Sequence, residues 1–410
     1  MTDEMTDDIT QSVLNIGTLG HIDHGKTSLV KALTHQWTDR HSESLKRNMT
    51  IKLGYADMII RKCSKCEGAA AYTVEDTCGK CGGKAEPLMR ASILDAPGHE
   101  TLMATAISEA NIINAILFVI AANEACPMQQ TREHLMIINL LGIQNVIIIQ
   151  SKIDIVGKQK ALENFRQIKN FIKGSSIENA PIIPVMTNHN INIDVLLEMI
   201  AKLPRPDPQL DAEPLMYIAR SFDVNKPGMD ASKIVGGIVG GTLTRGTFKV
   251  GDQIEIRPGI NVGQGSKKEV YAPVITVIEG INNGTGKLES AKAGGLIGLS
   301  TEIDPAFTKA DGLVGNIAGK PGKLPAAVSS LTIKYHKLKR DDIPERAFTV
   351  GEAIILSVGT ATVVGYIKKA KRDNLEIELK RPVAAEKGTK MAIMKNLLQR
   401  WRLTGYGIYN

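Results

Sequence analysis

The first half of the chain alternates between short apolar runs and segments with helical periodicity. The apolar runs predict buried strands at residues 12–20, 91–95, 115–122, 145–150 and 181–186. Between them, apolar side chains recur at helical spacing, which predicts helices over 26–33, 100–112, 129–141, 159–173 and 192–203. Strands that alternate with helices are typical of an α/β domain with a mostly parallel sheet and helices on both faces.

The second half of the chain has a different pattern. The segment 203–214, LPRPDPQLDAEP, contains four prolines and is typical of a stiff linker. Beyond it helical periodicity disappears, and short β-type segments are separated by turns such as RGTFKVGD and NNGTGK. This pattern predicts antiparallel β-barrels or sandwiches. Because 410 residues exceed what one core usually organises, we expect domains over 1–208, 209–325 and 326–410.

Charge and hydropathy narrow the class of protein. The net charge of +7 suits a nucleic-acid partner without showing one, and an aromatic content of 4% offers no obvious stacking platform for single strands. The longest apolar run, 112–122, is too short to span a bilayer. The N-terminal segment MTDEMTDD is acidic and lacks the apolar core of a signal peptide. We therefore expect a cytoplasmic protein with no membrane partner.

The segment GHIDHGKT, residues 20–27, fits the phosphate-loop pattern G-x-x-x-x-G-K-[S/T] between a predicted strand and a predicted helix. Glycines let backbone N–H groups wrap a phosphate, and the helix N-terminus favours negative charge. Lys26 would reach the β- and γ-phosphates, and the Thr27 hydroxyl can ligate Mg²⁺. A chance match in an ordinary strand-to-helix turn is the alternative. The predicted nucleotide contacts are Asp23, His24, Gly25, Lys26, Thr27 and Ser28.

A second motif, LDAPGHE at 94–100, ends the next apolar strand with Asp-x-x-Gly. Asp95 can hold Mg²⁺ directly or through water, and the Gly98 N–H can contact a γ-phosphate. His99 follows at once, where a group that orients water would be needed. Together with Lys26, these residues predict nucleotide hydrolysis.

The tetrapeptide SKID, residues 151–154, differs by one residue from Asn-Lys-x-Asp, with which many GTPases recognise guanine. Asp154 would pair with N1 and N2 of guanine, and Lys152 would pack its stem over the base. Ser151 stands where asparagine is usual, and losing one such hydrogen bond costs about 1–3 kcal/mol. We therefore expect guanine binding that is weakened but retained, with looser bracing of the surrounding loops.

Four of the five cysteines form two Cys-x-x-Cys pairs separated by 11 residues. Two such turns aim four thiolates at one point, which predicts a structural, tetrahedral Zn²⁺ site in a zinc knuckle at about residues 61–84. Disulfides or redox thiols are the alternatives, which a reducing cytoplasm disfavours. Cys126 is expected to be a plain thiol. The predicted zinc ligands are Cys63, Cys66, Cys78 and Cys81.

Taken together, these motifs carry a family resemblance. The segments GHIDHGKTSL, DAPGHE and AANEACPMQQTREHL resemble a translational GTPase of the broad elongation factor Tu group. More narrowly, the chain is similar to the gamma subunit of archaeal translation initiation factor 2 over essentially its whole length. The narrower resemblance rests on the four-cysteine insertion and on the segments at 41–57, 220–228, 251–259, 294–311 and 400–407.

The resemblance implies a GTPase domain followed by two β-barrels. It also implies a role, in which the GTP-bound subunit carries initiator methionyl-tRNA to the small ribosomal subunit within a heterotrimer with alpha and beta subunits. GTP hydrolysis to GDP then releases the tRNA. The aminoacylated tRNA end would lie between the GTPase domain and the first barrel, where Arg220, Arg245 and Lys249 are candidate phosphate contacts, although solvated surface charge is the commoner role of each.

The same resemblance assigns roles near the phosphates and the base. Thr50 would be the switch 1 Mg²⁺ ligand, and His99 would orient the attacking water. The second guanine motif falls on Met186, Thr187 and Asn188, where the family has Ser-Ala, so that the Thr187 N–H could reach guanine O6. The candidate metal-site residues around Mg²⁺ are Thr27, Thr50, Asp23, Asp95 and Asn48, the last standing where glycine is expected.

Three other functions stay open at this point. A selenocysteine-specific elongation factor would prefer a different tRNA. A non-catalytic scaffold would hold tRNA and subunits without switching, which the preserved phosphate motifs disfavour. A GTPase subunit of an ATP sulfurylase shares the early motifs but has no reason to carry the four cysteines. Because no arginine finger is evident in the sequence, we expect slow intrinsic hydrolysis that a partner on the ribosome accelerates.

Overall fold

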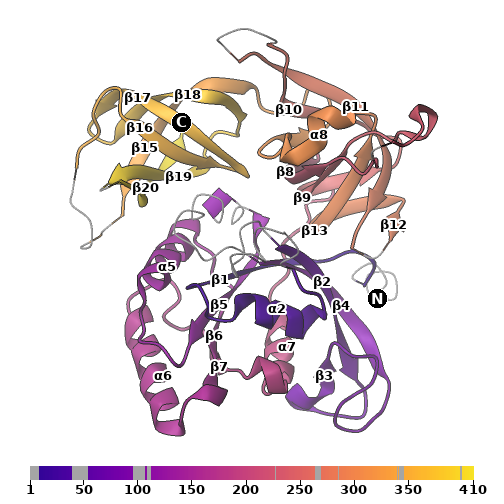
Figure 1. Cartoon of the computed structure of the whole chain (residues 1–410), viewed down its shortest axis with the longest axis vertical. Coiled ribbons are helices and arrows are strands. Elements are labelled where there is room, and N and C mark those ends of the chain that lie inside the picture. Colours follow the sequence, from indigo (N-terminus) through magenta and orange to yellow (C-terminus); the bar gives the residue numbers. More distant parts are fainter. Residues whose placement is uncertain are drawn as a thin grey trace. The chain divides into compact units, whose positions relative to one another are not determined.

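The computed structural model describes residues 9–38, 54–95, 107–108, 112–226, 228–263, 269–284, 286–338, 340, 346–397 and 399–410. The chain divides into two compact units, one of Met1–Ala106 with Ile113–Asp207 and one of Pro208–Asn410 with Ile107–Ile112 (Figure 1). Within the described residues, no helix is long and apolar enough to cross a membrane. The bounds of the three domains expected from the sequence stay predictions.

The first unit is built on a seven-stranded sheet with the order β3-β2-β4-β1-β5-β6-β7. Strands β4, β1, β5, β6 and β7 pair in parallel, which confirms the mostly parallel sheet. Strands β2 and β3 add an antiparallel edge that the sequence analysis did not anticipate, although the alternating burial of β2 is the usual pattern of a strand. The bounds are β1 Leu14–Gly20, β2 Gly54–Cys63, β3 Tyr72–Thr73, β4 Ala85–Asp95, β5 Ala115–Ala121, β6 Val146–Ser151 and β7 Ile182–Pro184.

Helices cover both faces of this sheet. Their bounds are α2 Lys26–Thr34, α5 Gln129–Leu141, α6 Lys158–Ile172 and α7 Ile193–Ala201, with 3₁₀ turns η1 Gly68–Ala71, η4 Ile153–Ile155 and η5 Thr187–His189. These confirm four of the five predicted helices, and most of the fifth, 100–112, lies outside the described residues.

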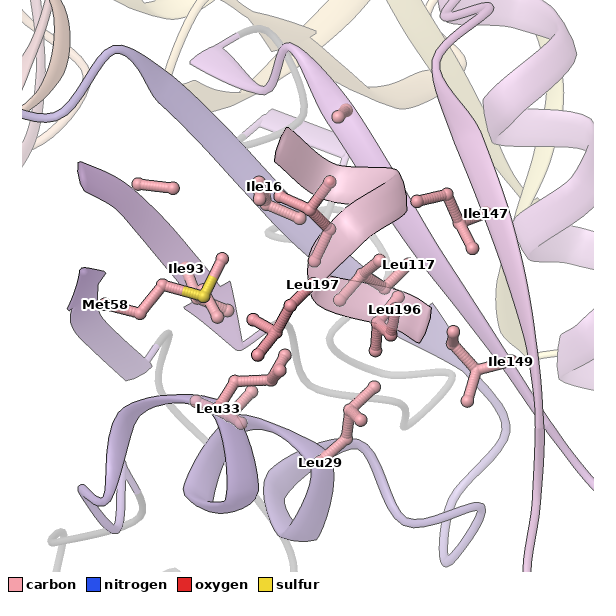
Figure 2. Packing of buried hydrophobic residues seen from close by; sticks show 14 of the residues in the cluster. Ile16, Leu29, Leu33, Met58, Ile93, Leu117, Ile147, Ile149, Leu196 and Leu197 are labelled. Carbon is pink, nitrogen blue, oxygen red and sulfur yellow. The ribbon is translucent and has the colours of Figure 1, made fainter. Parts of the chain in front are cut away.

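The core of the first unit forms where α2 and α7 pack on one face of the sheet. Figure 2 shows Leu29 of α2 and Leu196 of α7 converging on Ile16, Leu117 and Ile149 of the strands. Each such side chain stabilises the fold by about 1.5–3 kcal/mol when fully buried. Helices α5 and α6 bury side chains that do not belong to this cluster, so they cover the opposite face.

The carboxyl ends of the parallel strands meet at one edge of the sheet. The phosphate loop follows β1, Asp95 ends β4, and Ser151 ends β6. In open α/β sheets, this is the edge where ligands bind. Three motifs that are far apart in the sequence are therefore brought to one place by the order of the strands.

The second unit contains two closed antiparallel barrels, which confirms the barrels that the family resemblance implies and decides between the barrels and sandwiches left open by the sequence pattern. The first has the strand order β10-β14-β8-β9-β13-β11 and is closed by the pairing of β10 with β11. Its elements are β8 Leu215–Phe222, η6 Ala231–Lys233, β9 Ile238–Lys249, β10 Gln253–Asn261, β11 Tyr271–Asn282, β12 Lys287–Leu288, β13 Ser290–Thr301, α8 Pro305–Thr308, η7 Lys309–Asp311 and β14 Ile317–Gly319.

The second barrel closes in the order β15-β18-β17-β16-β19-β20. Its strands are β15 Ala327–Lys337, β16 Ala353–Val358, β17 Ala361–Lys371, β18 Asn374–Ala384, β19 Lys390–Leu397 and β20 Arg400–Tyr409. Each barrel has its own apolar cluster, with Phe248 and Ile256 among the residues of the first and Leu356 and Ile377 among those of the second.

Candidate nucleotide site and metal centre

The phosphate loop turns sharply between β1 and α2. Gly25, the N-cap of α2, has φ 90° and ψ 23°, a left-handed conformation that favours glycine. Gly20 has φ 149°, and a Cβ there would lie 2.2 Å from the Val119 carbonyl oxygen, so a side chain cannot be accommodated. The first N–H groups of a helix have no intrahelical partner. The turn therefore directs backbone donors of the α2 N-terminus, including those of Thr27 and Ser28, toward a bound phosphate.

Lys26 is buried beneath this loop. Its Nζ donates to the backbone oxygens of Gly20, at 2.9 Å, and His21, at 2.7 Å. Burial lowers the pKa of Lys26 to about 8, a shift that the carboxylates of Asp95 and Asp23 oppose. The charged form of Lys26 is thus disfavoured in the nucleotide-free protein, and bound phosphates would stabilise it.

Histidines around Lys26 are kept neutral by burial. Burial lowers the pKa of His24 to about 4 and that of His134 to about 3. His21 is shifted in the same direction, again mainly through burial. The positive charge available to a phosphate in this part of the loop is therefore that of Lys26.

Nucleotide affinity is expected to fall as the pH rises through about 8. In the nucleotide-free protein Lys26 loses its proton above that pH, whereas phosphates raise its pKa on binding, so binding must take up a proton. The dissociation constant of GDP should then rise by up to about tenfold per pH unit between pH 8 and 9. Titration at several pH values checks this. Lys26→Arg, which stays protonated, is the control, and the same pH slope in both proteins would contradict the prediction.

Asp95 and Thr27, the predicted magnesium ligands, lie in direct contact. The buried Asp95 carboxylate accepts hydrogen bonds from Thr18 Oγ1 at 2.9 Å, and from Thr27 Oγ1 and Thr38 Oγ1 at 2.8 Å each. Neighbouring oxygens in an octahedral Mg²⁺ shell lie about 2.9 Å apart, so the separation of Thr27 Oγ1 from the carboxylate fits adjacent ligands of one ion.

Of the other residues predicted to lie around the phosphates, one is exposed at the turn and four lie outside the described residues. Asp23 is exposed at the turn, with φ 59°, and nothing in the described chain assigns its carboxylate to the metal. The residues Asn48, Thr50, Gly98 and His99 lie outside the described residues.

The guanine motifs lie at the ends of β6 and β7. The Ser151 hydroxyl donates to the His24 carbonyl at 2.6 Å, so the bracing that the sequence analysis expected to be lost is present. The shorter serine side chain thus still reaches the backbone of the phosphate loop. Lys152, with φ 56°, starts the η4 turn that exposes Asp154.

The second guanine segment forms a compact turn next to the phosphate-loop helix. Met186 pairs with Ile191 through backbone bonds, and Thr187 opens η5, which contacts α2. Asn188 is exposed. The turn lies beyond β7 and therefore at the same edge as Ser151, so the two motifs can contribute to one base pocket.

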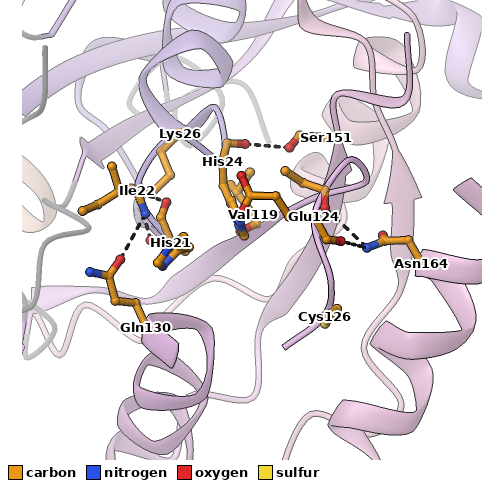
Figure 3. Close-up of polar contacts among 12 residues, drawn as sticks. His21, Ile22, His24, Lys26, Val119, Glu124, Cys126, Gln130, Ser151 and Asn164 are labelled. Carbon is orange, nitrogen blue, oxygen red and sulfur yellow. Dashed lines mark hydrogen bonds and ion pairs between the residues drawn. The ribbon is translucent and has the colours of Figure 1, made fainter. Parts of the chain in front are cut away.

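The sequence analysis missed contacts from the segment after β5. Figure 3 shows Glu124 facing the His24 ring and Gln130 facing the loop backbone. Glu124 Oε2 lies 3.2 Å from His24 Nε2, and Gln130 Oε1 accepts the Ile22 N–H at 3.2 Å. Their place in the sequence could have indicated these contacts, because both residues follow β5 at the edge of the sheet where the phosphate loop lies.

The four predicted zinc ligands gather between β2 and β4. Their sulfur atoms all lie within 4.8 Å of one another. Cys63 Sγ is 3.5 Å from Cys81 Sγ, and Cys66 Sγ is 3.7 Å from Cys78 Sγ. Thiolates around a tetrahedral zinc ion lie about 3.8 Å apart, whereas a disulfide needs about 2.0 Å. The cluster thus has the spacing of a zinc site and excludes the disulfide alternative.

The thiol chemistry also fits a metal. Backbone N–H groups of Cys81 and Lys80 lower the pKa of Cys78 to about 6, which favours the thiolate that zinc binds. Neighbouring thiols, Cys81 first, together with burial raise the pKa of Cys66 to about 12. Without a cation, the four neighbouring sulfurs cannot all be thiolates. A cation between them would stabilise all four thiolates. Cys126 lies outside the group, and burial raises the pKa of its thiol to about 12.

Replacing Cys81 by serine is expected to remove zinc from the protein. The wild type should hold about one zinc ion per chain and the variant almost none, because a structural site needs all four thiolates. Amide exchange in 61–84 should accelerate, since binding energy at such a site is also folding energy. Metal analysis and hydrogen exchange check both effects. Cys126→Ser is the matched control, and zinc loss there would contradict the assignment.

Two of the basic residues proposed to contact tRNA have partners within the barrel unit. Arg220 Nε donates to Asp311 at 2.9 Å, and the Arg245 guanidinium forks onto the Glu386 carboxylate. Arg245 lies on β9 of the first barrel and Glu386 follows β18 of the second, so this pair ties the barrels together. Lys249 is exposed at the end of β9 and stays a candidate for phosphate contact.

Comparison with known proteins identifies the family. Residues 11–205 match the family described as "Elongation factor Tu GTP binding domain", and residues 329–409 match "Initiation factor eIF2 gamma, C terminal". Translation initiation factor 2 subunit gamma of Methanococcus maripaludis strain C7 is 49% identical over 404 residues, which cover 97% of this chain and 98% of that protein. The chain belongs to the translation initiation factor 2 gamma-subunit family. The gamma subunit of Methanocaldococcus jannaschii is likewise 49% identical, over 97% of each chain.

Membership in the gamma-subunit family confirms the resemblance and makes the chain a translational GTPase. Solved structures agree on the fold. A bacterial selenocysteine-specific elongation factor matches with a TM-score of 0.73 at 23% identity, covering 97% of this chain and 58% of that one. The SelB factor of Methanococcus maripaludis, solved with a GTP analogue, matches with a TM-score of 0.72 at 22% identity, covering 98% and 80%. At this identity the likeness shows the shared architecture alone.

Proposed function

We propose that this gamma-subunit family member, in its GTP form, binds initiator methionyl-tRNA in the cytoplasm and delivers it to the small ribosomal subunit. It acts in a heterotrimer with alpha and beta subunits, and GTP hydrolysis releases the tRNA. The observation that carries the proposal is the 49% identity to named gamma subunits over nearly the whole of both chains. The fold likeness to selenocysteine-type factors is far more distant in sequence, at 22–23% identity.

The geometry supports a specific division of labour at the phosphates. Lys26 would exchange its bonds to the Gly20 and His21 oxygens for the β- and γ-phosphates. Thr27 and Asp95 would hold Mg²⁺, which when bound neutralises charge on these phosphates. The sequence supplies Thr50 as a further ligand and His99 to orient the attacking water. These two roles rest on the motifs alone.

Hydrolysis by the isolated chain is proposed to be slow and to be accelerated by a partner on the ribosome. Positioning and charge stabilisation dominate phosphoryl transfer, and a stimulated GTPase gains its rate from a group supplied in trans. Single-turnover hydrolysis by the isolated chain at the rate of a stimulated GTPase would contradict this proposal.

Filter binding with aminoacylated tRNAs tests the function. The full chain, zinc-loaded and with its alpha subunit, is titrated with initiator methionyl-tRNA and with an elongator aminoacyl-tRNA in the presence of GTP, GDP or ATP. The expected result is tighter binding of the initiator tRNA, with GTP above GDP and no support from ATP. Preference for an elongator or selenocysteinyl-tRNA would favour the elongation-factor alternative. Equal binding with every nucleotide would favour a scaffold that does not switch.

A further inference from the structure

His24 is one of the residues through which the rest of the domain holds the phosphate loop, beside Ile22 and Thr27. Its two neighbours, Asp23 and Gly25, have left-handed backbones with φ 59° and 90°, so the chain reverses sharply on either side of it. Its ring is 1% exposed and lies under the loop. Any rotation of this buried residue must reorient the adjoining peptide groups of the phosphate loop, whose N–H groups would bind the phosphates.

Three contacts fix His24 in place. Ser151 Oγ donates to its carbonyl at 2.6 Å, Nδ1 lies 3.2 Å from the Val119 carbonyl oxygen, and Nε2 lies 3.2 Å from Glu124 Oε2 (Figure 3). Val119 belongs to the sheet and Ser151 is already part of a guanine motif. Glu124 belongs to none of the nucleotide motifs, yet it is the one charged side chain among the three.

Glu124 is itself anchored from a different layer of the domain. Asn164 of α6 donates its Nδ2 to the Glu124 carbonyl at 3.0 Å. Gln150 of β6 in turn donates to Asn164 Oδ1 at 2.9 Å. A hydrogen-bonded chain therefore runs from the strand that ends in Ser151, through α6, to the backbone carbonyl of Glu124, the residue whose carboxyl group contacts the phosphate loop.

We propose that Glu124 is a positioning residue for nucleotide binding, which holds His24 and thereby keeps the phosphate-loop N–H groups aimed at the phosphates. Its carboxyl group faces the His24 ring, so it would act on the loop through that ring. Its loss should therefore speed nucleotide release without altering the choice of base. The inference rests on the GTPase activity of the family and is independent of the tRNA assignment.

The chemistry of the ring predicts which substitutions are tolerated. A carbonyl oxygen only accepts, so Nδ1 is the donor in the contact with Val119. In a neutral ring Nε2 is then an acceptor, as a carboxylate is, so the contact of Nε2 with Glu124 Oε2 is a hydrogen bond only with one proton shared between the two atoms. A glutamine amide at position 124 can donate to Nε2, whereas alanine leaves this nitrogen without a partner. Glu124→Gln should preserve the hold on the loop, and Glu124→Ala should release it.

Release of a fluorescent GDP analogue from the zinc-loaded full chain, chased with excess GDP, tests the proposal. Glu124→Ala should release the analogue at least about tenfold faster, the factor expected for one lost hydrogen bond to a charged group. Glu124→Gln should stay within about threefold of the wild type, since the hydrogen bond persists. Glu163→Ala, at an exposed glutamate of α6, is the matched control and should release at the wild-type rate.

Two further measurements separate positioning from general loss of structure. The ratio of GDP to ADP affinity should be unchanged in Glu124→Ala, since Asp154 still reads the base. Wild-type release rates in Glu124→Ala, or a Glu124→Gln variant as fast as Glu124→Ala, would overturn the proposal. Should the alanine variant fail to fold, Glu124→Asp tests the same contact with less disturbance. It keeps the charge but shortens the reach, so wild-type release there would also overturn the proposal.

Coupling to Ser151 tests whether the effect passes through His24. If Ser151 and Glu124 hold the same residue, the double variant Ser151→Ala/Glu124→Ala should release GDP by a factor that departs from the product of the two single effects. A simple product of the two factors would mean that the residues act separately and would overturn the route through His24.

Discussion

Replacing Lys26 by alanine is expected to weaken GTP binding roughly a hundredfold to ten-thousandfold and to abolish measurable hydrolysis. Each charge-assisted hydrogen bond from the ammonium to a phosphate is worth about 1.5–3 kcal/mol, and Lys26 would make two. The burial of this lysine strengthens the effect, because in a site shielded from water no solvent cation replaces the lost charge.

The Lys26→Ala experiment needs two safeguards. Removing the ammonium also deprives the Gly20 and His21 oxygens of a donor, so the free energy of unfolding should be measured in parallel with affinity. Lys31→Ala, at an exposed lysine one turn along α2, is the control for helix composition and charge. Near-normal GTP affinity in a folded Lys26→Ala protein would exclude the phosphate loop as the nucleotide site.

Exchanging Asp154 for asparagine is expected to change the base that the protein recognises. The carboxylate can accept from both N1–H and the 2-amino group of guanine, whereas an amide presents one acceptor and one donor. GTP affinity should fall by roughly one to two orders of magnitude, as a charge-assisted pair is replaced by an unmatched donor. Xanthosine triphosphate, with a carbonyl in place of the amino group, should bind better than before because the amide can donate to it.

Competition titrations with GTP, xanthosine triphosphate and ATP measure this exchange. Asp211→Asn makes the same chemical change at an exposed position and should leave all three affinities unchanged. If Asp154→Asn kept the preference of the wild type for GTP, the SKID segment would not be the guanine reader. The exposed position of Asp154 in η4 favours the experiment, because the substitution should barely affect folding.

The elements with the strongest periodicity could be predicted from sequence. The predicted helix 129–141 coincides with α5, and the strand at 115–122 coincides with β5 to within one residue. The antiparallel strand β2 was not predicted, because its burial alternates while its residues do not, with apolar Tyr55 and Ile59 on the less buried side. The local pattern of apolar residues therefore predicted most of the central sheet but not its antiparallel edge.

The site could be predicted where all of its residues belong to one motif in a short segment of the sequence. The phosphate loop and the paired cysteines are of this kind, since spacing alone determines that their atoms converge. The contact of His24 with Glu124 is not, because the two residues are 100 positions apart and meet only through the order of the strands. The same limit explains Ser151, whose bond to the His24 carbonyl spans 127 positions, and Arg245, whose partner Glu386 is 141 positions away.

The arrangement of strand edges has a consequence for the behaviour of the protein at high concentration. Both barrels close on themselves, and the first-unit sheet ends in β3 and β7, which contain two and three residues. Short or absent edges offer little unpaired backbone with which another chain could extend the sheet, and Pro184 at the end of β7 removes one more donor. Where the described sheet ends in β3 and β7, the protein is thereby protected against edge-to-edge association.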